Sequence, residues 1–438
     1  MCIRDRSEGH DVTCVDGDWD DIPYDRDWDL VGITVTTFTS QSAYAVARRF
    51  RERGVPVVFG GVHPSILPQE CLEHADAVVA GEAEYVWKEV LRDAGRKQLQ
   101  RIYRADRVTA MDDVPFPRRD LLNEQSWFAS LQATRGCPHV CKYCYLPNVP
   151  WHAYRRRHPD LVAEELRRMR QPIVYFVDDN FFADRDYAEA VARRIEPLKK
   201  KWAVQAPTTI VNHEDLVAAC AASGLFNVHI GFQTVNPASL DWAAVRQNRV
   251  SSYQKLVSLL HRHGILVTGF FIFGFDTDDP RIFGESVRTI RELDLDEAHL
   301  YILTPYPGTD LYEQFRREGR LDESKDRSHY GGANAVFTPK LMTARELEEG
   351  VQRMYRELHP FFRRKFAGAV FEAVAVDAAH PVAARRAVLG EPAEGIHRGA
   401  GWLSTRRAAA RHVPPCRQNP ALTPRWCCMP DAGLDTSA

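Results

Sequence analysis

The chain has 438 residues, 45% of them hydrophobic, and a formal net charge of -2. This length excludes a single small domain, and the hydrophobic content can fill the cores of two. A charge so close to zero gives no overall field toward nucleic acid or anionic lipid, so we expect no nucleic-acid partner without a local basic patch.

The hydrophobic and cysteine patterns favour a cytoplasmic protein. The longest apolar run, at residues 264–274, is well short of the roughly 20 residues that span a bilayer, and it is typical of a buried strand. We therefore expect no transmembrane segment, and no signal peptide is visible. The ten cysteines include one clustered trio and no regular disulfide framework, which suits a reducing compartment.

The N-terminal part predicts an incomplete α/β domain at residues 9–100. Residues 1–8 have no helix or strand pattern and indicate a disordered or artefactual start. Short apolar stretches then alternate with helical ones, which is typical of a doubly wound parallel sheet. The expected strands are residues 12–15, 29–35, 55–59 and 75–79, and the expected helices are residues 41–53 and 84–94. Because such a sheet normally opens with a further strand and helix, we expect this domain to be truncated.

Three loops of this domain are candidate ligand contacts. Parallel sheets bind ligands at the carboxyl ends of their strands, and the loops predicted there are rich in small or polar residues that let a large flat ligand approach the backbone. The candidate contacts are Thr36, Gly60, Gly61, His63, Gly81 and Glu82. Each piece also has an ordinary explanation, since His63 could be a loop histidine and the glycine pair a strand-to-helix turn.

A second, larger domain follows a polar, proline-bearing linker at residues 101–122. Apolar strands and helices alternate over residues 123–340, and such repeats close into a barrel with functional groups at the carboxyl ends of the strands. The expected strands are residues 130–134, 173–177, 202–205, 228–232, 267–273 and 298–303. We expect a partial, six-stranded β/α barrel of the TIM-like type, whose open side admits substrate.

Two segments follow the barrel. Residues 341–379 predict a helical extension, because Thr343 with Glu346 forms a capping box ahead of an apolar helix at residues 344–359. Residues 380–438 change in composition and contain eight arginines after residue 380 but no lysine. Their lack of any pattern predicts a disordered tail.

Three cysteines, Cys137, Cys141 and Cys144, lie at C-x3-C-x2-C spacing on a glycine-led loop after the first barrel strand. Three thiolates on a short loop can converge on one soft metal centre. A four-iron four-sulfur cube held by three cysteines leaves one iron open for a substrate. A structural zinc site is the alternative, but zinc wants four ligands there, and His139 and His152 lie at no zinc-finger spacing.

Polar residues follow the second to fifth barrel strands. The Asp178-Asp179-Asn180 trio offers acceptors for the ammonium group of a bound amino acid, although a helix N-cap would explain it as well. Gln205, Gln233 and the stretch containing Ile272 come at the later strand ends. The basic run at residues 154–158 could bind a phosphate or carboxylate, but a solvated charge run is the commoner explanation.

In their order along the chain, these motifs resemble one family. The cysteine spacing, with Tyr143 directly before the last cysteine, resembles the cluster loop of the radical S-adenosylmethionine (SAM) enzymes. Gly-Gly-x-His-Pro at residues 60–64, followed by Gly-Glu-x-Glu at residues 81–84, resembles the cobalamin-binding domain that precedes the cluster domain in one branch of them. The resemblance implies a 4Fe-4S cluster, SAM and cobalamin as cofactors. It implies cobalamin contacts at the three N-terminal loops and SAM contacts at Tyr143, Asp178, Asp179, Gln205, Gln233 and Ile272.

The same resemblance implies an enzyme in which the reduced cluster cleaves SAM to a 5'-deoxyadenosyl radical and methylcobalamin then methylates an unactivated carbon. A small-molecule substrate and an electron donor such as flavodoxin or ferredoxin would be its partners. The enzymatic alternative is a relative that cyclises or rearranges its substrate without methyl transfer, and a cofactor-based sensor is a further alternative. A sensor needs only one cofactor, whereas polar residues at four successive strand ends indicate a positioned co-substrate.

Overall fold

The computed structural model describes residues 10–15, 22–105, 107–119, 128–149 and 151–375. The chain divides into two compact units. One contains Thr13–Ala105 together with Glu323–Asn334, and the other contains Asp106–Asp322 together with the described residues from Ala335 onward. The predictions for residues 1–8 and 380–438 lie outside the described residues.

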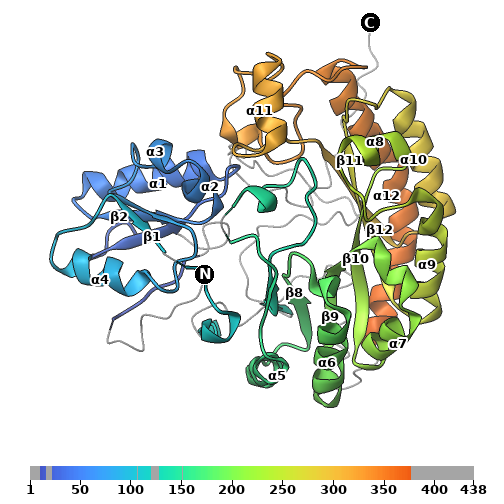
Figure 1. Ribbon diagram of the computed structural model, residues 1–438, viewed down its shortest axis with the longest axis horizontal. Helices are drawn as coiled ribbons and strands as arrows, with labels where there is room; N and C mark the ends of the chain where they lie inside the picture. Colours follow the sequence, from blue (N-terminus) through green and yellow to red (C-terminus); the bar gives the residue numbers. More distant parts are fainter. Residues whose placement is uncertain (1–9, 16–21, 106, 120–127, 150, 376–438) are drawn as a thin grey trace, which may run out of the picture. The chain divides into compact units, whose positions relative to one another are not determined.

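The N-terminal unit is a parallel sheet with helices on both faces (Figure 1). The strands pair in the order β1-β2-β3-β4 and are β1 (Val31–Thr34), β2 (Val57–Gly60), β3 (Ala77–Ala80) and β4 (Ile102–Arg104). The helices are α1 (Ser40–Glu52), α2 (Val62–Ile66), α3 (Pro68–Cys71) and α4 (Trp87–Gly95). Strand β3 is buried throughout because Val78 packs in the core that contains α1, while Val79 packs in the core that contains α4. The predicted parallel α/β domain is confirmed.

Two expectations for this unit are wrong. Residues 12–15 form no strand, and residues 102–104, which we expected in a linker, form the edge strand β4. Tyr103 explains the second error, because its ring is buried and its hydroxyl donates to a carboxylate oxygen of Asp93 on α4 at 3.1 Å. A strand of three residues is too short to show a clear alternating pattern in the sequence.

A segment from the second half of the chain, Glu323–Asn334, belongs to this N-terminal unit. Within the unit, Arg327 forms an ion pair with Glu70 at 3.6 Å. Gly331 lies so close to the ring of Phe38 that an added Cβ would be 2.6 Å from its Cε2 atom. We had expected residues 123–340 to belong to one core, and nothing in the sequence pattern sets this segment apart.

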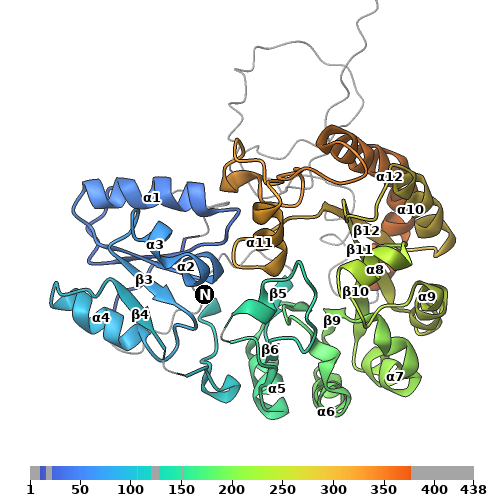
Figure 2. The same cartoon turned by 45° about the horizontal axis from the view of Figure 1, so that its top comes forward.

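The second unit is built on six parallel strands in the order β12-β11-β10-β9-β8-β5 (Figures 1 and 2). They are β5 (Phe128–Leu131), β8 (Ile173–Phe176), β9 (Lys201–Ala206), β10 (Leu225–Gln233), β11 (Leu266–Phe273) and β12 (Glu297–Ile302). The helices that pack on their outer face are α5 (Pro159–Arg168), α6 (Arg185–Ile195), α7 (Glu214–Ala222), α9 (Tyr253–Arg262), α10 (Arg281–Glu292) and α12 (Ala344–Ala375). Two shorter helices, α8 (Pro237–Trp242) and α11 (Asp310–Arg317), follow strands β10 and β12. The predicted partial six-stranded barrel is confirmed.

Alternation along the strands separates a helix-covered outer face from an inner face. In β12, Ala298, Leu300 and Ile302 are buried in the core, whereas the residues between them are half-buried. The outer edge of β12 is closed by a side chain from α12. The hydroxyl of Tyr355 accepts from the amide of Leu300 and donates to its carbonyl, both at 2.9 Å. This side chain satisfies backbone groups that an exposed edge strand would leave unpaired.

The long helix α12 begins with the predicted capping box. The hydroxyl of Thr343 accepts from the amide of Glu346 at 3.1 Å, and the Glu346 carboxylate accepts from the amide of Thr343 at 2.7 Å. The helix extends beyond the expected residue 359, as far as Ala375. None of the helices in the described part of the chain is both long and apolar enough to cross a membrane.

Candidate cofactor site

The three cysteines lie on a loop whose base is closed by the antiparallel pair β6 (Thr134–Arg135) and β7 (Arg155–Arg156). Cys137, Cys141 and Cys144 are half-buried, and the amide of Cys144 donates to the carbonyl of Cys141 at 3.0 Å in a tight turn. Burial raises the pKa of the Cys144 thiol to about 12. A bound metal therefore has to supply the positive charge that removes this proton.

Amide side chains from two other loops reach the cysteine sulfurs. The Nδ2 atom of Asn180 lies 3.6 Å from the sulfur of Cys137, and the Nε2 atom of Gln247 lies 3.6 Å from that of Cys141. Hydrogen bonds of this kind stabilise metal-bound sulfur and tune the reduction potential of a cluster. The sequence did not identify Gln247, because it lies more than a hundred residues from the cysteines in no recognisable motif.

Gly136 begins the loop in a conformation that other residues avoid. Its φ is 86°, in the left-handed region. An added Cβ would also lie 2.4 Å from the carbonyl oxygen of His152 and 2.5 Å from that of Ala153. The loop thus packs backbone against backbone at the residue that precedes the first cysteine.

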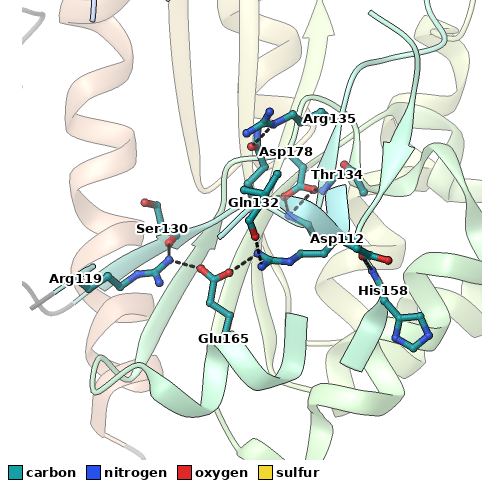
Figure 3. A network of polar contacts seen from close by, with 12 residues as sticks. Asp112, Arg119, Ser130, Gln132, Thr134, Arg135, His158, Glu165 and Asp178 are labelled. Carbon is teal, nitrogen blue, oxygen red and sulfur yellow. Dashed lines mark hydrogen bonds and ion pairs between the residues drawn. The ribbon is translucent and has the colours of Figure 1, made fainter. Parts of the chain in front are cut away.

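Two consecutive carboxylates hold the backbone that leads into the loop. Asp178, only 1% exposed, accepts from the amide of Ala133 at 3.1 Å and from the amide of Thr134 (Figure 3). Asp179 accepts from the amide of Gly136 at 2.8 Å. Burial raises the pKa of Asp178 to about 7, although these amide donors lower it.

This geometry bears on both interpretations of the trio. Asp178 is turned into the protein and is not placed to receive the ammonium group of SAM. The N-cap alternative holds by position only, because Asn180 precedes the 3-10 helix Phe181–Ala183 but its side chain makes no capping hydrogen bond. The side chain that caps α6 is Asp184, which accepts from the amide of Tyr187. Asp179 is half-buried and remains a candidate contact. The sequence pattern did not take into account that a buried carboxylate beside a strand end can accept hydrogen bonds from backbone amides of the same chain.

One residue of the basic run at residues 154–158, Arg157, has a structural role. Arg157 is 3% exposed and pairs with Glu165 on α5 at 2.5 Å, and Glu165 also pairs with Arg119 at 2.6 Å (Figure 3). Arg157 further donates to the carbonyl of Val114 at 2.8 Å. Arg157 is therefore neither a solvated charge nor placed to bind a phosphate. Its contacts link residues 114–119 to the barrel.

The carboxyl end of β10 has an unusual backbone conformation and is fixed by hydrogen bonds from Asn248 and Tyr253. Gln233 has a φ of 68°, which is uncommon for a non-glycine residue and is often found at functional sites. The Nδ2 atom of Asn248 donates to the carbonyls of Gly231 and Phe232 at 2.8 and 2.9 Å. The hydroxyl of Tyr253 donates to Phe232 at 2.8 Å. These contacts fix the position at which the Gln233 side chain leaves the strand.

The other predicted SAM contacts lie in the same unit. Gln205 is exposed on β9, and Ile272 is half-buried on β11, so Gln205, Gln233 and Ile272 come from three neighbouring strands. Tyr143 packs against Phe275, with ring centroids 6.2 Å apart, and burial raises its pKa well above the usual range.

In the N-terminal unit, hydrogen bonds tie the three predicted loops together at the carboxyl edge of the sheet. The amide of Val35, next to Thr36, donates to the carbonyl of Gly60 at 2.8 Å. The hydroxyl of Ser65 donates to the carbonyl of Gly61 at 2.7 Å and accepts from the amide of Gly81 at 2.8 Å. Ser65 was not predicted, and its single hydroxyl joins two of the loops. Thr36 is exposed, and Glu82, beside Gly81, is half-buried.

His63 is turned into the N-terminal unit and is 1% exposed. Its Nδ1 atom lies 3.2 Å from the hydroxyl of Thr37, and its Nε2 atom lies 3.0 Å from that of Tyr44 and 3.3 Å from a carboxylate oxygen of Glu70. The hydrogen bond from His63 holds the pKa of Glu70 below its usual range, against the effect of burial. With both ring nitrogens engaged, His63 can support its loop but is not placed to contact a ligand directly.

Comparisons with known proteins agree with both units. Residues 131–290 match the family model of the radical SAM superfamily, and residues 5–91 match that of the B12 binding domain. The chain is 31% identical over 369 residues to bacteriochlorophyllide d C-12(1)-methyltransferase of Chlorobaculum tepidum, with 81% of this chain and 80% of that protein covered. The chain belongs to the radical SAM enzymes that carry a B12-binding domain.

Solved structures show the same fold at low identity. The radical SAM methyltransferase TsrM from Kitasatospora setae, with cobalamin and a [4Fe-4S] cluster bound, is similar with a TM-score of 0.56 at 18% identity, covering 76% of this chain and 74% of that one. The cobalamin-dependent SAM radical enzyme OxsB, with aqua-cobalamin bound, has a TM-score of 0.62 at 15% identity, covering 80% and 61%. The family's cofactors are a 4Fe-4S cluster, SAM and, through the B12-binding domain, cobalamin.

The donor set of the cysteine loop fits such a cluster. Among the described residues, no group of three or more His, Cys, Asp or Glu side chains is placed to hold a single metal ion. A four-iron cube gives each cysteine its own iron, so it does not need three sulfurs around one ion. The amide groups of Asn180 and Gln247 beside two of the sulfurs suit bound sulfide or thiolate, which accepts hydrogen bonds.

Changing Asp178 to asparagine tests whether this residue holds the loop or binds SAM. The new NH2 group would face the buried amides of Ala133 and Thr134, and an unmet buried donor costs about 1–3 kcal/mol. We expect iron content after anaerobic reconstitution to fall severalfold, with the KM for SAM unchanged in the fraction that retains iron. Asp186→Asn, at an exposed position, is the control. Full iron content with a raised KM would show that Asp178 contacts SAM.

Proposed function

We propose that this chain is a cobalamin-dependent methyltransferase that adds a methyl group to an unactivated carbon of a small molecule. The observation that carries the proposal is the combination of the cysteine loop and the three joined loops of the B12-binding domain in one chain that is 31% identical to a methyltransferase over most of its length. Electron delivery by a flavodoxin or ferredoxin in the cytoplasm is part of the same proposal.

The roles of the residues follow from their positions. When bound, the cluster supplies the electron that cleaves SAM to a 5'-deoxyadenosyl radical, and cobalamin supplies the methyl group. Cys137, Cys141 and Cys144 would hold the cluster and leave one iron for SAM. The side chains that would position SAM are Tyr143, Asp179, Gln205, Gln233 and Ile272. Asp178 is a positioning residue that acts through the loop backbone.

Cobalamin would bind through the backbone and small side chains of the loops at Thr36, Gly60 and Gly61, and Gly81 and Glu82. Gly61 is needed for the packing of the loop itself, because its φ is 103° and an added Cβ would meet the Val35 carbonyl at 2.9 Å. At Gly60 an added Cβ would meet nothing within 4 Å, which leaves room for a ligand beside the backbone. His63 would support this surface from beneath, through Thr37.

Replacing Ser65 with alanine is expected to weaken cobalamin binding about tenfold. The change leaves the carbonyl of Gly61 and the amide of Gly81 without their shared partner, at a cost of about 1–3 kcal/mol. Equilibrium dialysis with hydroxocobalamin measures the effect, and Ser42→Ala on α1 is the matched control. Equal affinity of both variants would remove the joined loops from the cobalamin site.

The function itself is tested by the two products of SAM. The reconstituted wild-type protein, given SAM and a reductant, should release S-adenosylhomocysteine only when cobalamin is present, because methyl transfer from SAM needs an acceptor. Release of 5'-deoxyadenosine should depend on the cluster and the reductant. Release of 5'-deoxyadenosine with no cobalamin-dependent S-adenosylhomocysteine would favour the cyclase or rearrangement alternative.

A further inference from the structure

The inner face of the barrel carries a continuous group of rings that the cofactors do not account for. It consists of Tyr175 on β8, His229 on β10, Phe270 on β11, and His299 and Tyr301 on β12, and we call it the ring cluster. Ring centroids are 5.0 Å apart for Tyr175 and His229, 5.5 Å for His229 and Phe270, and 4.7 Å for Phe270 and His299. The planes of Phe270, His299 and Tyr301 lie within 10° of one another.

The ring cluster is not part of the core under the helices. All five side chains are half-buried, while their strand neighbours point the other way and are almost fully buried. These neighbours are Val174, Phe176, Val228, Ile230, Phe271 and Leu300. A closed barrel fills its interior mainly with branched aliphatic side chains, and this partial barrel presents accessible rings instead.

The ring cluster is uncharged at neutral pH. Burial lowers the pKa of both His229 and His299 to about 4, and His299 contributes to the shift of His229. The hydroxyl of Tyr175 lies 3.1 Å from Nδ1 of His229, so polar atoms are joined within the cluster. Among the described strand residues of the inner face, formal charge is confined to the strand starts, at Lys201 and Glu297.

We propose that the ring cluster binds a planar, uncharged, π-conjugated part of the substrate, a specificity that rests on the proposed function of this barrel. An anionic group placed there would lose its hydration without a counter-ion, which is costly. A cationic group would also lose its hydration, and a cation–π contact of about 0.5–2 kcal/mol is smaller than that cost. Rings contribute stacking or edge contacts beyond the burial of area. A saturated polycycle would be stabilised only by the burial of apolar area. The inner face offers few aliphatic side chains that would favour such a group; Ile272 on β11 is one of them.

The proposal is tested with probes of one carbon skeleton. Equilibrium dialysis of the full-length, cluster-reconstituted protein would compare 2-naphthol, which is planar and neutral, with trans-2-decalol, which is saturated, and with 2-naphthoate, which is charged. We expect 2-naphthol to bind at least about threefold more tightly than either of the other probes. A difference of this size corresponds to the free energy of one or more ring contacts. Tighter binding of the saturated or the charged probe would overturn the proposal.

Substitutions locate the binding. Phe270→Leu and His299→Leu remove one ring each but keep apolar volume, and each should weaken 2-naphthol about two- to tenfold with little change for trans-2-decalol. Phe128→Leu, at an exposed ring outside the cluster, should change neither affinity. Unchanged 2-naphthol binding in both cluster variants would overturn the proposal, provided that their iron content shows a folded barrel.

The binding test is separate from methyl transfer, because dialysis needs neither SAM nor turnover. Preferred binding of 2-naphthol in a protein that forms no S-adenosylhomocysteine would sink the methyltransferase proposal and leave the ring cluster as the site of a planar substrate in another radical reaction. Active SAM turnover without that preference would sink only the assignment of the ring cluster.

Discussion

Replacing Cys141 with alanine is expected to abolish cluster binding and, with it, the formation of 5'-deoxyadenosine. Three cysteines are the whole protein ligand set of the proposed cluster, and a fourth ligand is not available to compensate because that position belongs to SAM. The measurement is iron content after anaerobic reconstitution, with the electron paramagnetic resonance signal of the reduced protein and the yield of 5'-deoxyadenosine. Cys137→Ala and Cys144→Ala should behave alike.

A cysteine outside the loop provides the control. Cys220 lies on α7 and is buried in the hydrophobic core. Cys220→Ala should lower the stability modestly but retain the iron, the resonance signal and the cleavage of SAM. A protein that retained both signal and cleavage in all three loop variants would contradict the assignment of the cluster ligands.

Replacing Gly136 with alanine should be nearly as damaging although it removes no ligand. The left-handed φ alone costs roughly 1–2 kcal/mol, and the added Cβ would overlap the carbonyls of His152 and Ala153, which are backbone atoms and cannot rotate away. A competent loop then becomes at least about tenfold rarer. We expect iron content to fall sharply, as measured by reconstitution under the same conditions.

Gly264→Ala separates the two causes. Gly264 also has a left-handed φ, of 70°, but nothing lies within 4 Å of the added Cβ. It should lower the melting temperature slightly and leave iron content intact. If Gly136→Ala were as mild as Gly264→Ala, the close backbone packing at the base of the cysteine loop would not be what shapes the site.

The sequence was sufficient for the parts of the fold that depend on repeated pattern. All six barrel strands were predicted within a few residues, because long apolar stretches such as the one ending at Phe273 alternate with amphipathic helices. The three cysteines were expected on one loop, and they lie together between β6 and β7. Short elements failed where no period can develop, as for β4 at Ile102–Arg104.

Two residues with ligand-binding side chain types bind the protein itself, for one physical reason. Asp178 and Arg157 have the residue types of ligand-binding groups, but each is buried and bonded to its own chain, through Thr134 and Glu165 respectively. Residue type indicates what a side chain can bind, whereas burial decides whether a ligand can reach it. Ser65 and Gln247 show the opposite case, since ordinary residues acquire roles only through segments that the fold brings beside them.

The most direct test of the central claim follows one methyl group. The protein, reconstituted with cluster and cobalamin, would be given SAM with a CD3 methyl group, a reductant and a small-molecule extract of the cells that make it. Cobalamin-dependent methylation predicts a product that carries one CD3 group in place of one hydrogen, with S-adenosylhomocysteine and 5'-deoxyadenosine formed in equal amounts. A product altered without gain of the CD3 group, accompanied by 5'-deoxyadenosine alone, would contradict it.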